Sequence, residues 1–194
     1  MQLLKSKKAG KKILAFLLIL LLLTGFLFLK APAQKKYYPK KYPEEIALAA
    51  EKYDLDENLL YAVIHTESGF QADAVSSVGA RGLTQIMPET FEWLQNKRGE
   101  NYPNEALFEP AISIDYGAYF YKLLLTKYDG DIQTAAAAYH SGTGQVAKWL
   151  QEPENSKDGK TLLKIPGKNA KHYAQKILTA MEKYQEIYEK EQDT

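Results

Sequence analysis

Helical spacing of apolar side chains extends through most of the chain from Pro43 to Ile187, and it constrains the fold more than any other feature. The expected helices are one beginning at Pro43, one capped by Asp56, one beginning at Met87 and Pro88, one from Pro110 to Tyr128, one between Asp131 and Gly142, a short one containing Val146 and Trp149, and a last one containing Tyr173 and Ile187. Residues 68–86 and 151–166 lack this period. The sequence therefore predicts a compact, mostly α domain with an irregular or short hairpin insertion between the second and third helices.

The N-terminus has a different pattern. Residues 1–12 contain five lysines, and residues 13–29 form an apolar run of 17 residues interrupted only by Thr24 and Gly25. Membrane spans need about 17 to 25 residues and signal-peptide cores about 7 to 15, so a retained transmembrane helix is favoured. A signal cleaved at Ala31-Pro32-Ala33 is the alternative. Lysines before the run place residues 1–12 in the cytoplasm, so we expect a single-pass cell-membrane protein whose folded domain is extracytoplasmic.

Residues 30–43 are expected to form a linker between this anchor and a catalytic domain at residues 44–190. Gln34 to Pro43 contains two prolines, four lysines and three tyrosines, with neither a helical nor a strand period. A solvated spacer is the simpler interpretation, and contact with anionic lipid or wall polymer is the alternative.

Charge and cysteine content exclude several classes of protein. Residues 1–30 hold six lysines and no acid, which leaves 19 basic against 24 acidic residues from Ala31 onward, a formal charge of −5. That balance argues against a nucleic-acid partner. The absence of cysteine excludes disulfides and thiolate chemistry, and the three histidines form no His-Glu-x-x-His pattern, so we expect neither metal nor cofactor.

Glu67 is the carboxylate that helical geometry singles out. The apolar stripe of the expected second helix consists of Leu59, Leu60, Val63 and Ile64. At about 100° per residue, Glu67 falls in the middle of that stripe. An ionised carboxylate on a buried face is unfavourable, so Glu67 requires a partner, a wet cleft or a raised pKa. A raised pKa is also what a proton donor to a glycosidic oxygen needs near neutral pH. The alternative is that Glu67 turns outward at a frayed helix end.

Four segments, in order and spacing, resemble the lytic transglycosylases of the soluble, lysozyme-like type. Glu67-Ser68-Gly69-Phe70 is similar to the family's catalytic Glu-Ser motif, and residues 79–88 are similar to its Gly-Leu-Met-Gln segment. Residues 138–142 are similar to its Ala-Tyr-Asn-Ala-Gly motif, and residues 173–177 match its Tyr-x-x-Lys-Ile. The similarity covers about residues 44–185 and implies a lysozyme-like transglycosylase domain.

The resemblance also implies an activity. Glu67 is then the sole catalytic acid and base, and it cleaves the β-1,4 bond between N-acetylmuramic acid and N-acetylglucosamine of peptidoglycan, with closure of a 1,6-anhydro ring. The residues implied to bind substrate are Ser76, Gln85, Met87, Tyr139, His140 and Tyr173. From periodicity alone, Tyr173 belongs to the core of the last helix.

Departures from the family pattern leave alternatives open. Thr84 replaces the usual Met, and His140 and Ser141 replace Asn-Ala, so sugar binding could depend on pH near neutrality. A hydrolytic muramidase of the same fold would need a second carboxylate, for which Asp73 is the nearest candidate, although a loop-capping role is simpler. A weakly active glycan-binding module of a wall-spanning assembly is the third hypothesis. A monomer is the default expectation.

Overall fold

The computed structural model describes residues 32–188, which fall into two units, residues 32–39 and residues 40–188. In the first unit, residues 32–37 are helical, and the Tyr38 N–H donates to the Gln34 carbonyl at 2.8 Å. This helical turn differs from the irregular spacer expected there. Pro39 restricts only the residue before it, so Gln34 and the two lysines that follow remain free to be helical.

The predicted cytoplasmic segment 1–12 and membrane anchor 13–29 lie outside the described residues. Between residues 32 and 188, no helix has both the length and the apolar character that crossing a membrane requires.

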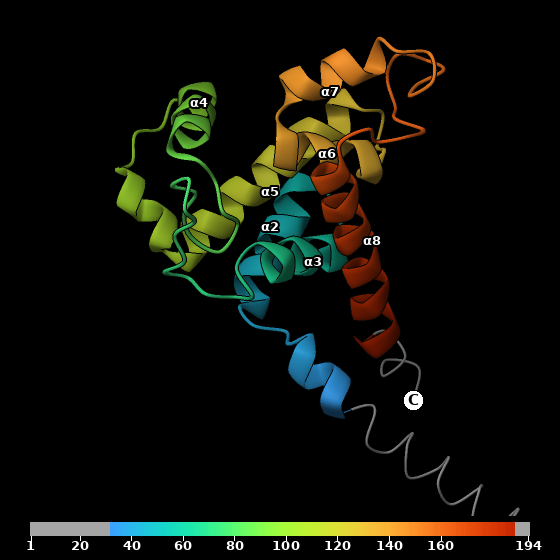
Figure 1. The fold of residues 1–194 in the computed structure, drawn as a ribbon. Coiled ribbons are helices and arrows are strands. Elements are labelled where there is room, and N and C mark those ends of the chain that lie inside the picture. Colours follow the sequence, from blue (N-terminus) through green and yellow to red (C-terminus); the bar gives the residue numbers. More distant parts are fainter. Residues whose placement is uncertain (1–31, 189–194) are drawn as a thin grey trace, which may run out of the picture. The chain divides into compact units, whose positions relative to one another are not determined.

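The second unit consists of helices joined by short loops and two irregular segments (Figure 1). The helices are α2 (Pro43–Tyr53), α3 (Glu57–Glu67), α4 (Pro88–Arg98), the 3-10 helix η1 (Asn104–Phe108), α5 (Pro110–Lys127), α6 (Ile132–Ser141), α7 (Thr143–Leu150) and α8 (Lys168–Tyr188). Every helix expected between Pro43 and Ile187 is present, which confirms the mostly α class. The short η1 was not predicted, and α8 begins five residues before Tyr173.

Helix boundaries follow local capping chemistry. The Asp56 carboxylate accepts from the Asn58 N–H at 2.7 Å, and the Asp131 carboxylate accepts from the Thr134 N–H at 2.7 Å. Each bond satisfies one of the N–H groups that a helix leaves unpaired at its start. Pro88 occupies the first turn of α4, where its missing N–H costs nothing, and Gly142 ends α6 with a φ of 81°.

Two apolar clusters contribute to the core of the described part of this unit. The larger one joins α3, α5, α6 and α8, where α8 packs against both α3 and α6, and the four alanines 135–138 are fully buried. The smaller cluster joins α4, η1 and α5. Phe120 on α5 packs against both clusters. Helix α5 therefore connects the lobe that contains α4 and η1, called the α4 lobe below, with the lobe that contains α3, α6 and α8, as Figure 1 shows.

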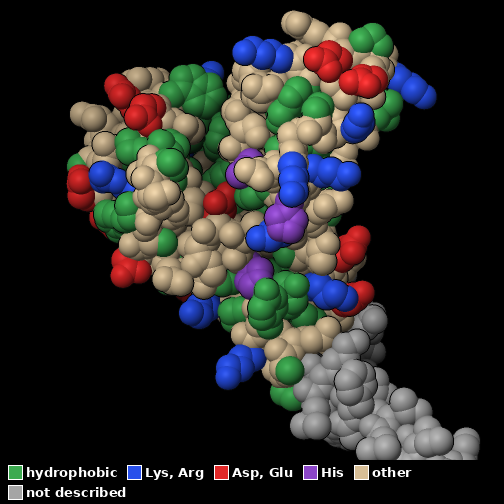
Figure 2. Space-filling model, in the orientation of Figure 1, with side chains coloured by type: hydrophobic (Ala, Val, Ile, Leu, Met, Phe, Trp, Pro, Cys, Tyr) green, Lys and Arg blue, Asp and Glu red, His purple; other side chains and the backbone are tan. Residues whose placement is uncertain are grey.

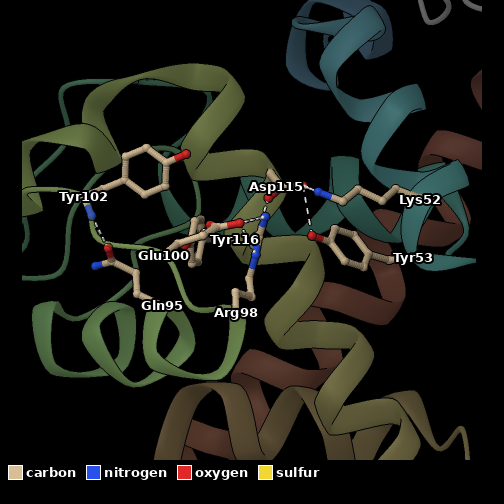
Figure 3. Close-up of polar contacts among 8 residues, drawn as sticks. All are labelled: Lys52, Tyr53, Gln95, Arg98, Glu100, Tyr102, Asp115 and Tyr116. Carbon is tan, nitrogen blue, oxygen red and sulfur yellow. Dashed lines mark hydrogen bonds and ion pairs between the residues drawn. The ribbon is translucent and has the colours of Figure 1, made fainter.

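A polar network fixes α4 to the rest of the unit (Figure 3). The Asp115 carboxylate of α5 pairs with Lys52 of α2 at 2.6 Å and with Arg98 at the end of α4. The Tyr53 hydroxyl also donates to Asp115, at 3.0 Å, and Arg98 pairs with Glu100 at 2.9 Å. These bonds lower the Asp115 pKa against the opposing effect of burial. The network therefore sets the position of the α4 lobe relative to α2 and α5.

The insertion between α3 and α4 is irregular, as predicted. Its only ladder contacts within the described chain are isolated antiparallel bridges from Arg81 to Val75 and to Ile86. Gly82 adopts a φ of +74°, and a Cβ on it would lie 1.8 Å from the Leu107 carbonyl oxygen. Glycine is therefore required for the loop to pack against η1.

Candidate active site

Glu67 is the last residue of α3, and its side chain turns inward rather than fraying into solvent. The Tyr173 hydroxyl of α8 donates to the Glu67 Oε1 atom at 2.5 Å. Tyr173 is itself 92% buried, because it lies on the apolar stripe that packs α8 against α3 and α6. The first and last motifs of the sequence therefore meet, because the tyrosine of the Tyr-x-x-Lys-Ile segment donates to the carboxyl of the Glu-Ser segment.

Electrostatics around Glu67 favour its protonated form. Burial raises the pKa of Glu67 to about 7, and the hydrogen bond from Tyr173 opposes this rise. No ionised neighbour is needed to explain the shift, because removal of the carboxylate from water is the dominant cause. A substantial fraction of Glu67 carboxyls is therefore protonated near neutral pH, where an ordinary glutamate is fully ionised.

Aromatic rings surround this carboxyl. The His140 ring stacks on the Tyr173 ring with centroids 4.9 Å apart, and the Tyr139 ring stacks on Tyr121 of α5 at 4.7 Å. Burial raises the pKa of Tyr139 well above its usual value, and the charge of Glu67 adds to that rise. The structure thus brings three of the predicted site residues, Tyr139, His140 and Tyr173, together around Glu67.

His140 is exposed, at the edge of this group. Partial burial lowers its pKa below the usual 6.5, so the imidazole is neutral over most of the range in which Glu67 titrates. A pH effect on sugar binding through His140 would therefore appear on the acidic side of pH 6.5 rather than centred on neutrality.

Thr84, the departure from the family methionine, has a packing explanation. Its hydroxyl donates to the Ser113 carbonyl at 2.8 Å, and its side chain lies where a Cβ on Gly117 would come within 2.4 Å. The Thr84 carbonyl in turn accepts from the Tyr139 hydroxyl at 2.6 Å. A small residue at 84 facing Gly117 therefore places the loop so that Tyr139 is anchored beside Glu67.

The other predicted residues lie in the insertion and its end. Gln85 has a φ of 49°, and its amide nitrogen donates to the carbonyls of Ala74 and Gly82 at 3.1 and 2.8 Å. The Ser76 hydroxyl accepts from the Ala80 N–H at 3.0 Å, and Met87 occupies the N-cap position of α4 without a capping side-chain hydrogen bond. Within the described residues, none of these three side chains has a hydrogen bond to Glu67. Their visible role is to shape the loop, which is compatible with substrate binding.

Asp73, the alternative second carboxylate, is exposed on the insertion. Across residues 32–188, no group of three or more His, Cys, Asp or Glu side chains could hold a metal ion. Figure 2 shows the molecular face hollowed between the lobe carrying α4 and the part carrying α6 and α7, with acidic and histidine side chains in the hollow.

Tyr121 and Ser113 were not predicted as site residues. Burial raises the pKa of Tyr121, and the groups that act on it are Tyr173 and Glu67, so its hydroxyl lies beside the acid. Both residues come from the α5 pattern, where the sequence shows only an apolar stripe. The role of Ser113 depends on its contact with Thr84, 29 residues away, and the role of Tyr121 depends on Tyr173 and Glu67, so no local pattern reveals either residue.

Comparison with known proteins agrees with this site. A family model described as the transglycosylase SLT domain matches residues 44–162, so the chain belongs to that family, as the four motifs predicted. It is 33% identical over 125 residues to the membrane-bound lytic murein transglycosylase C of Yersinia enterocolitica, a match that covers 59% of this chain and 35% of that protein. The chain thus spans about a third of the length of that curated relative.

Solved structures give the same fold. An inactive Glu-to-Gln mutant of the lytic transglycosylase Slt from Pseudomonas aeruginosa superimposes with a TM-score of 0.68 at 28% identity, over 77% of this chain and 25% of that chain. The 70 kDa soluble lytic transglycosylase of Escherichia coli gives 0.71 at 21% identity, over 79% of this chain and 25% of the other. These neighbours establish a lysozyme-like, mostly α fold.

Proposed function

We propose that this protein is a peptidoglycan lytic transglycosylase that cleaves the β-1,4 bond between N-acetylmuramic acid and N-acetylglucosamine without water. The observation that carries the proposal is the Glu67 carboxyl, whose pKa burial raises to about 7 and whose Oε1 accepts from Tyr173 at 2.5 Å. Membership of the SLT family and the murein transglycosylase named above support the substrate class.

In the first step Glu67 acts as a general acid. With Oε1 occupied by the Tyr173 hydroxyl, Oε2 is the oxygen that carries the proton. A pKa of about 7 leaves roughly half of the Glu67 carboxyls protonated at pH 7. Transfer of that proton to the bridging oxygen lets the glycosidic bond break and leaves Glu67 ionised.

In the second step the Glu67 carboxylate acts as a base. It accepts the proton of the 6-hydroxyl of N-acetylmuramic acid while that oxygen bonds to the anomeric carbon, which closes the 1,6-anhydro ring. The proton balance returns Glu67 to its starting state. A single acid is sufficient for this sequence, and the exposure of Asp73 on the insertion argues against a second carboxylate partner.

The residues around Glu67 are proposed to bind the glycan. His140 is exposed and stacks on Tyr173, which leaves its other ring face to a sugar, and the Tyr139 ring lies in the same group. Among the described residues nothing donates to the Gln85 Oε1, which leaves an acceptor for an N-acetyl N–H. Ser76 and Met87 would line the same cleft from the insertion and the start of α4.

We further propose that the apolar run at residues 13–29 anchors the enzyme in the cell membrane, with the catalytic domain outside. The support is the run itself, the lysines before it, and a relative that is named membrane-bound. Labelling of residues on both sides of the run in intact cells would test this topology.

The experiment that tests the activity is mass spectrometry of the fragments released from purified peptidoglycan by the full chain in detergent. Fragments one water lighter than hydrolysis products are expected, and Glu67→Gln should abolish them. Glu57→Gln is the matched control, because Glu57 lies exposed on the first turn of the same helix.

Two outcomes would replace the proposal. Fragments with free reducing ends would make the protein a muramidase and direct attention to Asp73. Retention of glycan by both the wild type and Glu67→Gln, with no fragments from either, would make it a binding module.

A further inference from the structure

Trp93 of α4 is the largest side chain of the α4 lobe, and 45% of it is exposed. The other large apolar residues of this helix, Phe91 and Leu94, are fully buried. A tryptophan left half in solvent forgoes much of the hydrophobic stabilisation that its size offers, so its exposure calls for an explanation.

Trp93 stands at the end of a row of aromatic rings that leads to the catalytic acid. The Trp93 ring meets Phe120 edge to face with centroids 6.1 Å apart, and Phe120 meets Tyr139 at 5.0 Å. Tyr139 is adjacent in sequence to His140, which stacks on Tyr173, the partner of Glu67. The ring contacts therefore run from α4 across α5 to Tyr139 of α6, and the next residue of α6, His140, contacts Tyr173 of α8.

The row places Trp93 two ring contacts from Tyr139, a separation comparable to the length of a short oligosaccharide. Figure 2 shows hydrophobic side chains on the α4 lobe beside the hollow. Phe120 supports the indole from one side, and the Lys97 ammonium lies 5.0 Å from its centroid. A surface cation–π contact of this kind contributes only about 0.5–1 kcal/mol, so a ligand can replace it.

Sugars are the ligand class that such a platform suits. The C–H groups of a pyranose face carry partial positive charge and match the negative face of an aromatic ring, and the indole N–H can donate to a hydroxyl. We propose that Trp93 is a remote sugar-binding site that stacks against the same glycan strand whose bond Glu67 cleaves. This inference rests on the proposed function, and it adds a residue that binds substrate far from the reacting bond.

Fluorescence tests the contact directly, because the chain contains only two tryptophans. In the full-length double variant Glu67→Gln, Trp149→Phe, all tryptophan emission comes from Trp93, and no turnover occurs. The probe is soluble glycan strands from which the peptides have been removed with an amidase. Binding is followed in parallel by calorimetry, which does not depend on Trp93.

A saturable blue shift of the emission that tracks the calorimetric binding curve is expected, because a stacked sugar displaces water from the indole. Calorimetric binding without any change in emission would overturn the Trp93 site and leave the proposed function standing. Absence of both heat and emission change would overturn the site together with the glycan binding on which the function depends.

Kinetics separate a binding role from a structural one. With Glu67 intact, Trp93→Ala should raise the KM for long strands about tenfold, leave kcat nearly unchanged, and be largely rescued by Trp93→Phe. Tyr102→Ala is the matched control, since Tyr102 is another exposed aromatic of the same lobe, 42% exposed, outside the row. An equal effect of both alanine variants, or a fall in kcat alone, would refute the role.

Discussion

Replacement of Glu67 by glutamine should stabilise the protein, in a strongly pH-dependent way. The pKa of Glu67 is about 7 in the folded state, against 4.5 for an unperturbed glutamate. The folded state therefore binds more protons than the unfolded state between these values, and stability falls as the pH rises from about 4.5 to 7. At about 1.36 kcal/mol per pKa unit, the ionised Glu67 costs on the order of 3 kcal/mol above pH 7.

Glutamine keeps the shape of the side chain and an oxygen that can accept from Tyr173, but it carries no charge. Glu67→Gln should therefore raise the free energy of unfolding by roughly 2–3 kcal/mol at pH 8 and leave it nearly unchanged at pH 4, where Glu67 is protonated in both states. Urea titrations at the two pH values measure the difference.

Glu57→Gln again serves as the control, because Glu57 is exposed and its replacement should shift stability little and by a similar amount at both pH values. The reasoning is refuted if Glu67→Gln changes stability equally at pH 4 and pH 8, or destabilises the protein at pH 8. Either result would mean that Glu67 is ionised without penalty, and a raised pKa could not explain its role as an acid.

Tyr173→Phe removes the donor that lowers the pKa of the proposed acid, so the alkaline limb of the pH–rate profile should move to higher pH, in addition to any loss of rate; an unmoved limb would contradict this. Gly82→Ala should cost more than about 2 kcal/mol of stability by urea denaturation, because its Cβ meets the Leu107 carbonyl, whereas Gly79→Ala, with open space around it, should cost only the backbone strain of about 1 kcal/mol; similar losses would contradict the packing argument. Asp115→Asn should lose about 2 kcal/mol at pH 7, and this loss should shrink as the pH falls below the ordinary range of aspartate; a pH-independent loss would show that the Asp115 charge is not the cause.

Helix positions were predictable because they depend on local chemistry. Asp56 and Asp131 cap the helices that follow them, and Pro88 and Pro110 begin theirs, all within one turn of the residues they affect. The 3-10 helix η1 was missed because five residues are too few to show a period. The helical turn at residues 32–37 was not predicted because its sequence shows no helical period, and nearby prolines restrict only the residues that precede them.

The site was predictable in part. Helix geometry predicts Glu67 on the buried face of α3. Its partner Tyr173 lies 106 residues later in the sequence, so only the resemblance to a family could pair the two residues. Periodicity assigned Tyr173 to the core and the resemblance assigned it to the cleft. The ring is buried in the core while the hydroxyl donates to Glu67, so a core position does not prevent contact with the acid. Thr84 depends on Gly117 and Ser113 of α5, and no local pattern links those positions.

We propose that Glu67 alone breaks the bond and that the substrate's own hydroxyl attacks in place of water. Digestion of peptidoglycan in water enriched in oxygen-18, followed by mass spectrometry of the new glycan ends, tests this most directly. The account predicts 1,6-anhydro ends without oxygen-18 from the wild type, and none of these ends from Glu67→Gln. Oxygen-18 at the new reducing ends would contradict it, because water would then be the attacking group.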